Sequence, residues 1–245
     1  MKTIDDILEY LIGVFKKDID IYYKDYINDL KYIIDGTINN IGGKYDPSDY
    51  IHRNELEMMH MNIESKIDEL FNDIEESKTQ VLKDAYKKSY ELYDDEYDII
   101  LFNTKMDEAL NSLWSGVNYK DRLNRHRYLL KFQSNSVANN GIVNHMSTKA
   151  IKTELSKILS SQYNAMKSLS NTELTYIMNQ ATIDYCNANS IVEVEIVDDN
   201  KCCDLCRANK GKRFKARNIK PSDYMLHTNC RCRIKPIYRK SNRKK

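Results

Sequence analysis

Glycine and proline are scarce in this sequence. The 245 residues include seven glycines and three prolines. Chain reversals should therefore be few, and the elements between them should be long. Such a composition favours helices over the short, turn-rich strands of β-sandwiches and barrels. Because 30% of the residues are charged, much of this helical surface should face water. The sequence predicts a mainly α-helical fold.

Long apolar runs are also missing. No run approaches the roughly 18 residues that a membrane-spanning helix needs. The first apolar stretch, MKTIDDILEYLIG, contains acidic residues, which argues against a secretory signal peptide. We therefore expect a chain that folds in the cytoplasm, has no membrane partner and keeps its six cysteines reduced. Gly-rich phosphate loops and nucleophile motifs are absent too, so we expect neither an enzyme nor a small-molecule substrate.

Charge is unevenly distributed along the chain. Residues 1–100 contain 24 acidic and 12 basic residues, and residues 101–200 contain ten of each. Residues 201–245 contain 16 basic and two acidic residues, a net charge of +14. A basic end on a nearly neutral chain is typical of proteins that contact a polyanion, although basic tails can also serve solubility alone.

Apolar residues in the first 100 positions repeat with the helical period. From Ile4 to Ile33 they recur every three or four residues. Gly42-Gly43 should end this helix, and Asp46-Pro47 should cap and begin the next. That second helix is expected to exceed 40 residues, with a break near Ser77. We expect an antiparallel helical hairpin, whose narrow apolar stripes suit either a bundle core or a surface for partner helices.

Residues 101–190 are predicted to form a body of shorter helices. Serine, threonine and asparagine are preferred N-cap residues, because their side chains accept backbone N–H groups. A capping box and a glycine turn supply the remaining boundaries. We expect four helices. The first starts at Thr104 with Asp107, and the second spans roughly 120–140 and ends at Asn139-Asn140-Gly141. The third starts at Ser147 or Thr148, and the fourth at Asn171 or Thr172.

The pattern changes at Ile191. Val192, Val194 and Ile196 alternate with glutamates, which is typical of a half-buried strand. Residues 191–238 should therefore form a small module of short strands and loops. The basic tail, residues 239–245, is expected to be disordered.

Five of the six cysteines lie in this last region. Cys203-x-x-Cys206 is followed by His227-x-x-Cys230-x-Cys232. Zinc prefers four tetrahedral thiolate and imidazole ligands, and a pair of ligands is commonly closed by a second pair roughly 15–20 residues away. We expect a zinc site formed by the first pair, the histidine and one further cysteine. Cys230 is favoured because His-x-x-Cys can form a compact turn, and Cys232 is the alternative.

A structural role is expected for this zinc. Four protein ligands leave no open position for water or substrate. The module has few apolar residues, so metal binding would supply its folding free energy. The competing interpretation is a set of buried free thiols. Cys202 is expected to be a bystander, and Cys186 a core residue on a helix.

Basic residues next to the cysteines are candidates for DNA contact. If residues 230–234 form a strand, Arg231 and Arg233 lie on the face opposite the zinc. Contacts of this kind reach phosphates and carry no sequence information. The residues that we expect to contact DNA are Arg231, Arg233, Arg239, Lys240, Arg243, Lys244 and Lys245.

The terminal motifs resemble those of a phage protein family. Cys203-x-x-Cys206, Gly211-Lys212-x-Phe214 and His227-Thr-Asn-Cys230-Arg-Cys232 together resemble the end of the phage Mu F-like minor head proteins, also called head morphogenesis proteins. The resemblance covers roughly residues 112–238 and includes the stretch around Trp114. Thr172-Glu173 lies where the family often has Arg-Thr-Glu, with Asn171 in place of the arginine and of any ion pair that it makes.

This resemblance implies a structural role in the virion. The family implies a minor capsid protein of low copy number, located in the capsid interior or near the portal and acting in head assembly. Expected partners are the portal protein, the major capsid protein or both, together with non-specifically bound DNA. Residues 1–100 are the best candidates for the contact with the portal. The alternative is a regulatory protein that binds nucleic acid through a zinc module.

Overall fold

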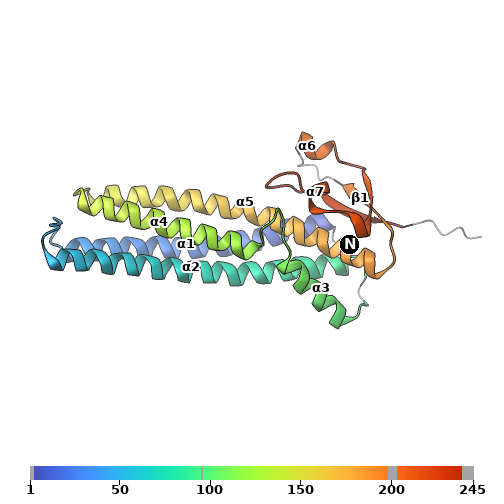
Figure 1. The fold of residues 1–245 in the computed structure, drawn as a ribbon, viewed down its shortest axis with the longest axis horizontal. Coiled ribbons are helices and arrows are strands. Elements are labelled where there is room, and N and C mark those ends of the chain that lie inside the picture. Colours follow the sequence, from blue (N-terminus) through green and yellow to red (C-terminus); the bar gives the residue numbers. More distant parts are fainter. Residues whose placement is uncertain (1–2, 95, 198–202, 239–245) are drawn as a thin grey trace, which may run out of the picture. The chain divides into compact units, whose positions relative to one another are not determined.

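Long helices make up most of the protein. The computed structural model describes residues 3–94, 96–197 and 203–238. Its main helices are α1 (Ile4–Asn40), α2 (Tyr50–Glu91), α3 (Ile99–Asn111), α4 (Tyr119–Val143) and α5 (Thr148–Ala188) (Figure 1). Within the described ranges, no helix combines the length and apolar character that crossing a bilayer requires. The expected mainly α-helical class with a small C-terminal β-rich part is confirmed.

Contacts divide the chain into two compact units. The helical unit comprises Lys16–Ser77 and Lys120–Lys167. The mixed unit comprises Met1–Phe15, Lys78–Tyr119 and Ser168–Lys245. Each of the expected ranges, 1–100 and 101–190, contributes to both units. The compact units differ from the linear ranges because helices are stabilised mainly by packing their apolar faces on other helices, which need not be neighbours in the sequence.

In the helical unit, segments of four long helices pack on one another. Apolar side chains from each segment are fully buried, including Ile19, Ile63, Leu130 and Ile151. Polar pairs link α1 to α2, α2 to α4, α4 to α5 and α5 back to α1, so each helix has two neighbours. These pairs are Asp29–Lys66, Asp68–Lys131, His126–Gln162 and Lys152–Asp35.

The start of α2 differs from the expected position at Pro47. The helix begins at Tyr50, because the carboxylate of Asp49 accepts the N–H of Ile51 at 2.7 Å. Asp46 instead closes the preceding turn, where its carboxylate accepts the N–H of Ser48 at 2.8 Å. Both aspartates are local caps of the kind the sequence suggested, but the second one starts the helix.

Three helices continue through positions where a break, an end or a new start was predicted. Ser77 lies within α2, and its hydroxyl donates to Asp18 of α1 at 2.6 Å. Gly141 lies within α4 and packs on Ile151 of α5. The single helix α5 includes Thr172, whose hydroxyl donates to the carbonyl of Ser168 at 3.2 Å.

Two further caps can be compared with the sequence. Ser147 accepts the N–H of Ala150 at 3.3 Å before α5, as predicted. The predicted cap at Thr104 is wrong, because this residue lies inside α3. Asp98 caps that helix instead, and its carboxylate accepts the N–H groups of Ile100 and Leu101 at 2.9 and 3.0 Å.

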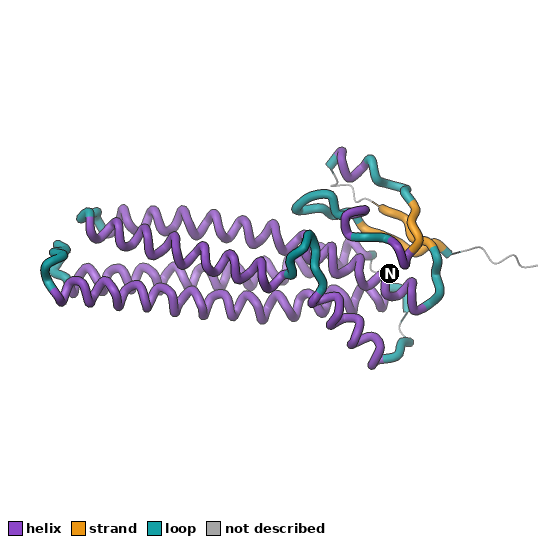
Figure 2. Tube along the Cα trace, viewed as in Figure 1, coloured by secondary structure: helices purple, strands orange, loops and turns teal. Residues whose placement is uncertain are grey.

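The module in the mixed unit contains a three-stranded antiparallel sheet. Its strands are β1 (Glu193–Val197), β2 (Arg213–Lys215) and β3 (Arg233–Ile237), in the order β2-β1-β3. The predicted alternation is confirmed for Val194 and Ile196, which are fully buried, whereas Val192 precedes the strand and is exposed. Figure 2 shows these strands beside the last turns of α5. Short helical turns connect them: α6 (Asp204–Arg207), η1 (Ala216–Asn218) and α7 (Pro221–Tyr224).

Candidate metal centre

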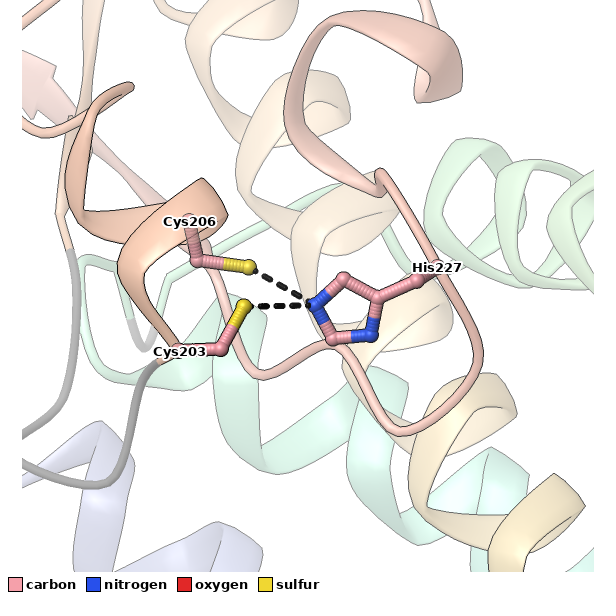
Figure 3. A group of neighbouring side chains, drawn as sticks. All are labelled: Cys203, Cys206 and His227. Carbon is pink, nitrogen blue, oxygen red and sulfur yellow. Dashed lines mark hydrogen bonds between the residues drawn. The ribbon is translucent and has the colours of Figure 1, made fainter.

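The first two cysteines are presented by one short helix. Cys203 is the N-cap residue of α6, and Cys206 lies within its single turn. Their sulfurs therefore point toward the same neighbour, His227, in the loop after α7 (Figure 3). The Nε2 atom of His227 lies 3.2 Å from Cys203 Sγ and 3.0 Å from Cys206 Sγ. This triad extends from the surface into the module: Cys203 is exposed, whereas Cys206 is buried.

A second triad shares Cys206 with the first. It consists of Cys206, Cys230 and Cys232, all of which are buried, and its ligand atoms lie within 4.8 Å of one another. Cys206 Sγ and Cys230 Sγ are 3.6 Å apart. Tetrahedral zinc, with Zn–S bonds of about 2.3 Å, places two sulfurs about 3.8 Å apart. The spacing fits such a site, so this cluster of four cysteines and one histidine could bind a metal such as zinc.

A backbone hydrogen bond selects the tautomer of neutral His227 that can ligate a metal. Its Nδ1 lies 2.6 Å from the carbonyl oxygen of Thr228. A carbonyl oxygen only accepts, so Nδ1 must carry the proton of this hydrogen bond. In the neutral ring, the lone pair is then on Nε2, the atom that faces the two sulfurs. The same bond to Thr228 is the main cause that raises the pKa of His227.

The thiols hold their protons unequally. A hydrogen bond from Cys232 lowers the pKa of Cys230 to about 5, and donating that bond raises the pKa of Cys232. Burial raises the pKa of Cys206 to about 12. A backbone N–H at Cys206 lowers the pKa of the Cys203 thiol. Because metals bind thiolates, loading the cluster would displace protons chiefly from Cys206 and Cys232.

Helix α5 fixes the segment that carries the last two cysteines. The fully buried side chain of Asn179 donates to the carbonyl of Cys232 at 2.9 Å and accepts the N–H of Ile234 at 3.0 Å. Thr172 accepts the N–H of Asn229 at 2.8 Å, where the backbone has a positive φ of 61°. These bonds lie on either side of the two cysteines and orient them, as the outer partners of metal ligands commonly do.

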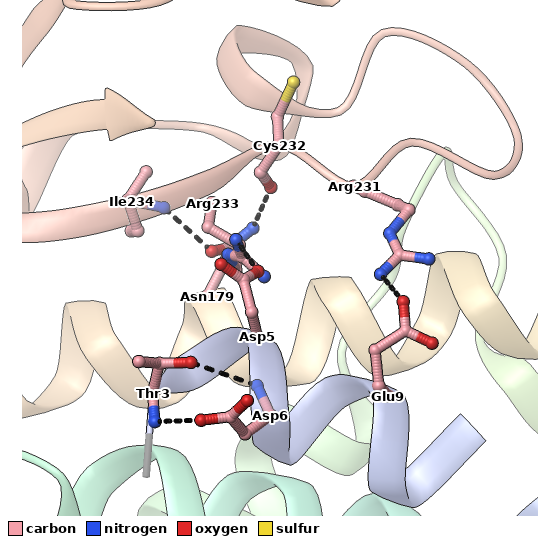
Figure 4. A network of polar contacts seen from close by, with 9 residues as sticks. All are labelled: Thr3, Asp5, Asp6, Glu9, Asn179, Arg231, Cys232, Arg233 and Ile234. Carbon is pink, nitrogen blue, oxygen red and sulfur yellow. Dashed lines mark hydrogen bonds and ion pairs between the residues drawn. The ribbon is translucent and has the colours of Figure 1, made fainter. Parts of the chain in front are cut away.

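Two arginines in this segment pair with carboxylates of α1. Arg231 binds Glu9 and Arg233 binds Asp5, and both guanidinium groups point away from the sulfur of Cys232 (Figure 4). The predicted orientation away from the cluster is therefore found, although β3 begins only at Arg233. The expected contact with DNA is corrected for Arg233: with 2% of its side chain exposed, its guanidinium is not accessible to a phosphate. The side chain of Arg231 is 16% exposed and forms its ion pair with Glu9.

The Asn-Thr-Glu triplet of α5 has a structural role. Glu173 forms an ion pair with Lys78 of α2, and each side chain is 2% exposed. The resemblance leads us to expect an arginine at position 171, where this chain has Asn171. The positive charge next to Glu173 comes from Lys78 instead. Asn171 donates to Asn229 at 3.2 Å, next to the cluster. No sequence pattern points to Lys78 as this partner, because it lies far from the triplet along the chain.

Other predicted residues lie away from the cluster. Cys186 is fully buried in α5, as expected for a core residue. Cys202 and the predicted DNA-contacting residues of the tail fall outside the described residues; the latter are Arg239, Lys240, Arg243, Lys244 and Lys245. Comparisons of the chain with protein-family models, curated proteins and solved structures find no match.

Proposed function

We propose that this chain is a structural minor head protein of a phage virion, acting in head assembly near the portal. The observation that carries the proposal is the convergence of the five motif residues that resemble the family's terminal signature. Cys203, Cys206, His227, Cys230 and Cys232 come together in one cluster. The cluster supplies at least four donors from the chain itself, which suits a structural metal better than a catalytic one.

Zinc is the proposed metal. It would join α6, the loop after α7 and the segment before β3, which carry the five candidate ligands. A module of this size buries little apolar surface, so the metal would contribute much of its folding free energy. The orientation of His227 by Thr228 supports an imidazole ligand.

The first two helices are the proposed contact surface for the portal or the major capsid protein. Large apolar side chains are exposed along both helices, although single exposed apolar residues are common on protein surfaces. A partner helix could cover several of them at once. The exposed residues are Tyr10, Ile21, Tyr32, Tyr50, Ile51, Met58 and Met61.

A regulatory protein that binds nucleic acid is the second candidate. It is favoured by the basic excess of residues 201–245, which carry 16 basic and two acidic residues. A regulator would bind one base sequence tightly, through side chains that reach base edges. A minor head protein would need only non-specific contacts to phosphates.

Mass spectrometry of purified virions and empty proheads tests the proposal. We expect peptides of this chain in both particles, at a small fraction of the abundance of the major capsid protein. Recovery from proheads separates an assembly component from a protein trapped with the packaged DNA. Absence from both particles, with the chain present in the lysate of infected cells, would refute the head role and favour the regulator.

A further inference from the structure

The module keeps a group of exposed cations after Arg231 and Arg233 are paired with α1. They lie between α6 and α7, where residues 207–220 contain no acidic residue. We call residues 210–220 the basic segment. Its cations are all exposed: Lys210, Lys212, Arg213, Lys215, Arg217 and Lys220.

Carboxylates neutralise only part of this charge. Arg213 lies 3.7 Å from Glu195 on the neighbouring strand, and Glu193 lies opposite Lys215 in the sheet. The side chains of Lys215, Arg217 and Lys220 make no ion pair with any residue in the described ranges. The segment therefore retains a net positive field at the surface of the module.

The backbone of the basic segment is fixed to the sheet. Ile196 of β1 accepts the N–H of Gly211 at 2.8 Å and donates its own N–H to the carbonyl of Lys212 at 2.9 Å. Ala216 donates to the carbonyl of Val192 at 2.9 Å. These bonds hold the main chain between the cations in place before any ligand arrives, which lowers the entropy cost of binding.

The surroundings of the cations favour a polyanion over an acidic protein surface. Protein interfaces centre on buried apolar and aromatic side chains. Between residues 207 and 220, no large apolar side chain is exposed, and Ala216 and Ile219 are buried. Contacts to phosphates need only cations and hydrogen-bond donors, which this segment offers.

We propose that the basic segment binds the phosphate backbone of duplex nucleic acid without reading its sequence. The basic segment would supply the non-specific phosphate contacts that a minor head protein needs, but the binding does not depend on the chain being a virion component. It takes the place of Arg231 and Arg233 as the candidate DNA-binding site, because these two arginines are paired with Glu9 and Asp5. The binding groups are the side chains of Lys215, Arg217 and Lys220, with the neighbouring cations adding to the field.

Fluorescence anisotropy with a short labelled duplex, measured over a range of salt concentrations, tests this proposal in the full chain. The test variant is Lys215→Gln, Arg217→Gln and Lys220→Gln together. The control variant is Lys17→Gln, Lys24→Gln and Lys149→Gln, which changes the net charge equally at exposed lysines of the helical unit. Far-UV circular dichroism and metal content confirm that both variants fold.

The salt dependence gives the decisive readout. Each lost phosphate contact lowers the slope of log affinity against log salt by about 0.9, so the test variant should lose about 2.7 and bind at least tenfold more weakly at low salt. The control variant should keep the wild-type slope. Equal slopes for the test and control variants would overturn the proposal, as would wild-type protein that binds no duplex.

Two further probes separate the kinds of nucleic acid. Similar affinity for duplexes of unrelated base sequence is expected, and duplex RNA of equal length should also bind. Strong preference for one DNA sequence would overturn backbone recognition and favour the regulator. If no duplex binds, the proposal for the basic segment fails, whereas the role in the phage head is still tested by mass spectrometry of virions and proheads. The two proposals can therefore fail separately.

Discussion

Cys206 is the residue on which the candidate metal centre depends most. It belongs to both triads, whereas each of the other four donors belongs to one. The sequence predicted all five donors, because metal ligands follow short spacings that are visible along the chain. It favoured Cys230 as the fourth ligand and kept Cys232 as the alternative, and the structure brings both into the cluster.

The proposed zinc should therefore depend on Cys206. If the cluster holds zinc as proposed, Cys206→Ala should lose it, because both triads lose their shared sulfur. Cys186→Ala is the matched control, since this cysteine is equally buried but lies outside the cluster. Metal analysis of both variants after purification under reducing conditions makes the comparison. Full zinc content in Cys206→Ala would contradict the assigned ligand set.

The ion pair between Lys78 and Glu173 yields a second prediction at this scale. Both side chains are 2% exposed, so removing one partner leaves the other charge buried without its opposite. Glu173→Gln should cost about 3–5 kcal/mol of unfolding free energy. Replacing both residues, with Lys78→Met and Glu173→Leu, should recover much of this loss. Denaturation followed by circular dichroism measures both, and an equally unstable double variant would contradict the pairing.

At the scale of elements, the existence of the helices was predictable but their boundaries were not. Apolar periodicity reports which face is buried, and it identified the first two long helices and strand β1. The local signals for helix boundaries were misleading at Ser77, Gly141 and Thr172, which suggested a break, an end and a new start. Each of these residues has a tertiary or intrahelical contact that the local pattern does not contain. Such contacts override intrinsic propensity.

Gly141 provides a test of this explanation. A methyl group at this position would lie 2.7 Å from Ile151 Cδ1, so Gly141→Ala should overpack the contact between α4 and α5. We expect it to destabilise the protein by about 1–3 kcal/mol. Gly36 is the matched control in α1, because its added methyl group meets nothing within 4 Å.

The two glycines should respond in opposite directions. Gly36→Ala should stabilise the protein by roughly 0.5–1 kcal/mol, as expected for a glycine inside a helix. Urea denaturation of both variants against wild type gives the comparison. Stabilisation by Gly141→Ala would show that Ile151 moves aside at little cost, and the close approach would then not explain the glycine.

At the scale of the whole molecule, linear ranges do not correspond to independent parts. Residues 1–100 contribute Asp5, Glu9 and Lys78 to the mixed unit and Asp18 to the helical unit. Deleting this range would remove structure from both units, so it cannot locate a partner's binding surface. The sequence could not reveal these contacts, because the paired residues are far apart along the chain. Single substitutions at exposed residues are the appropriate way to map partner contacts.

The C-terminal cluster is proposed to hold one structural metal ion. X-ray absorption spectroscopy at the zinc edge, on protein purified under reducing conditions, tests it most directly. We predict about one zinc per chain, surrounded by three sulfur atoms and one imidazole nitrogen, because four protein donors complete a tetrahedral structural site. Protein without zinc would contradict the claim. So would zinc that binds an oxygen atom of water, since an open position belongs to a catalytic site.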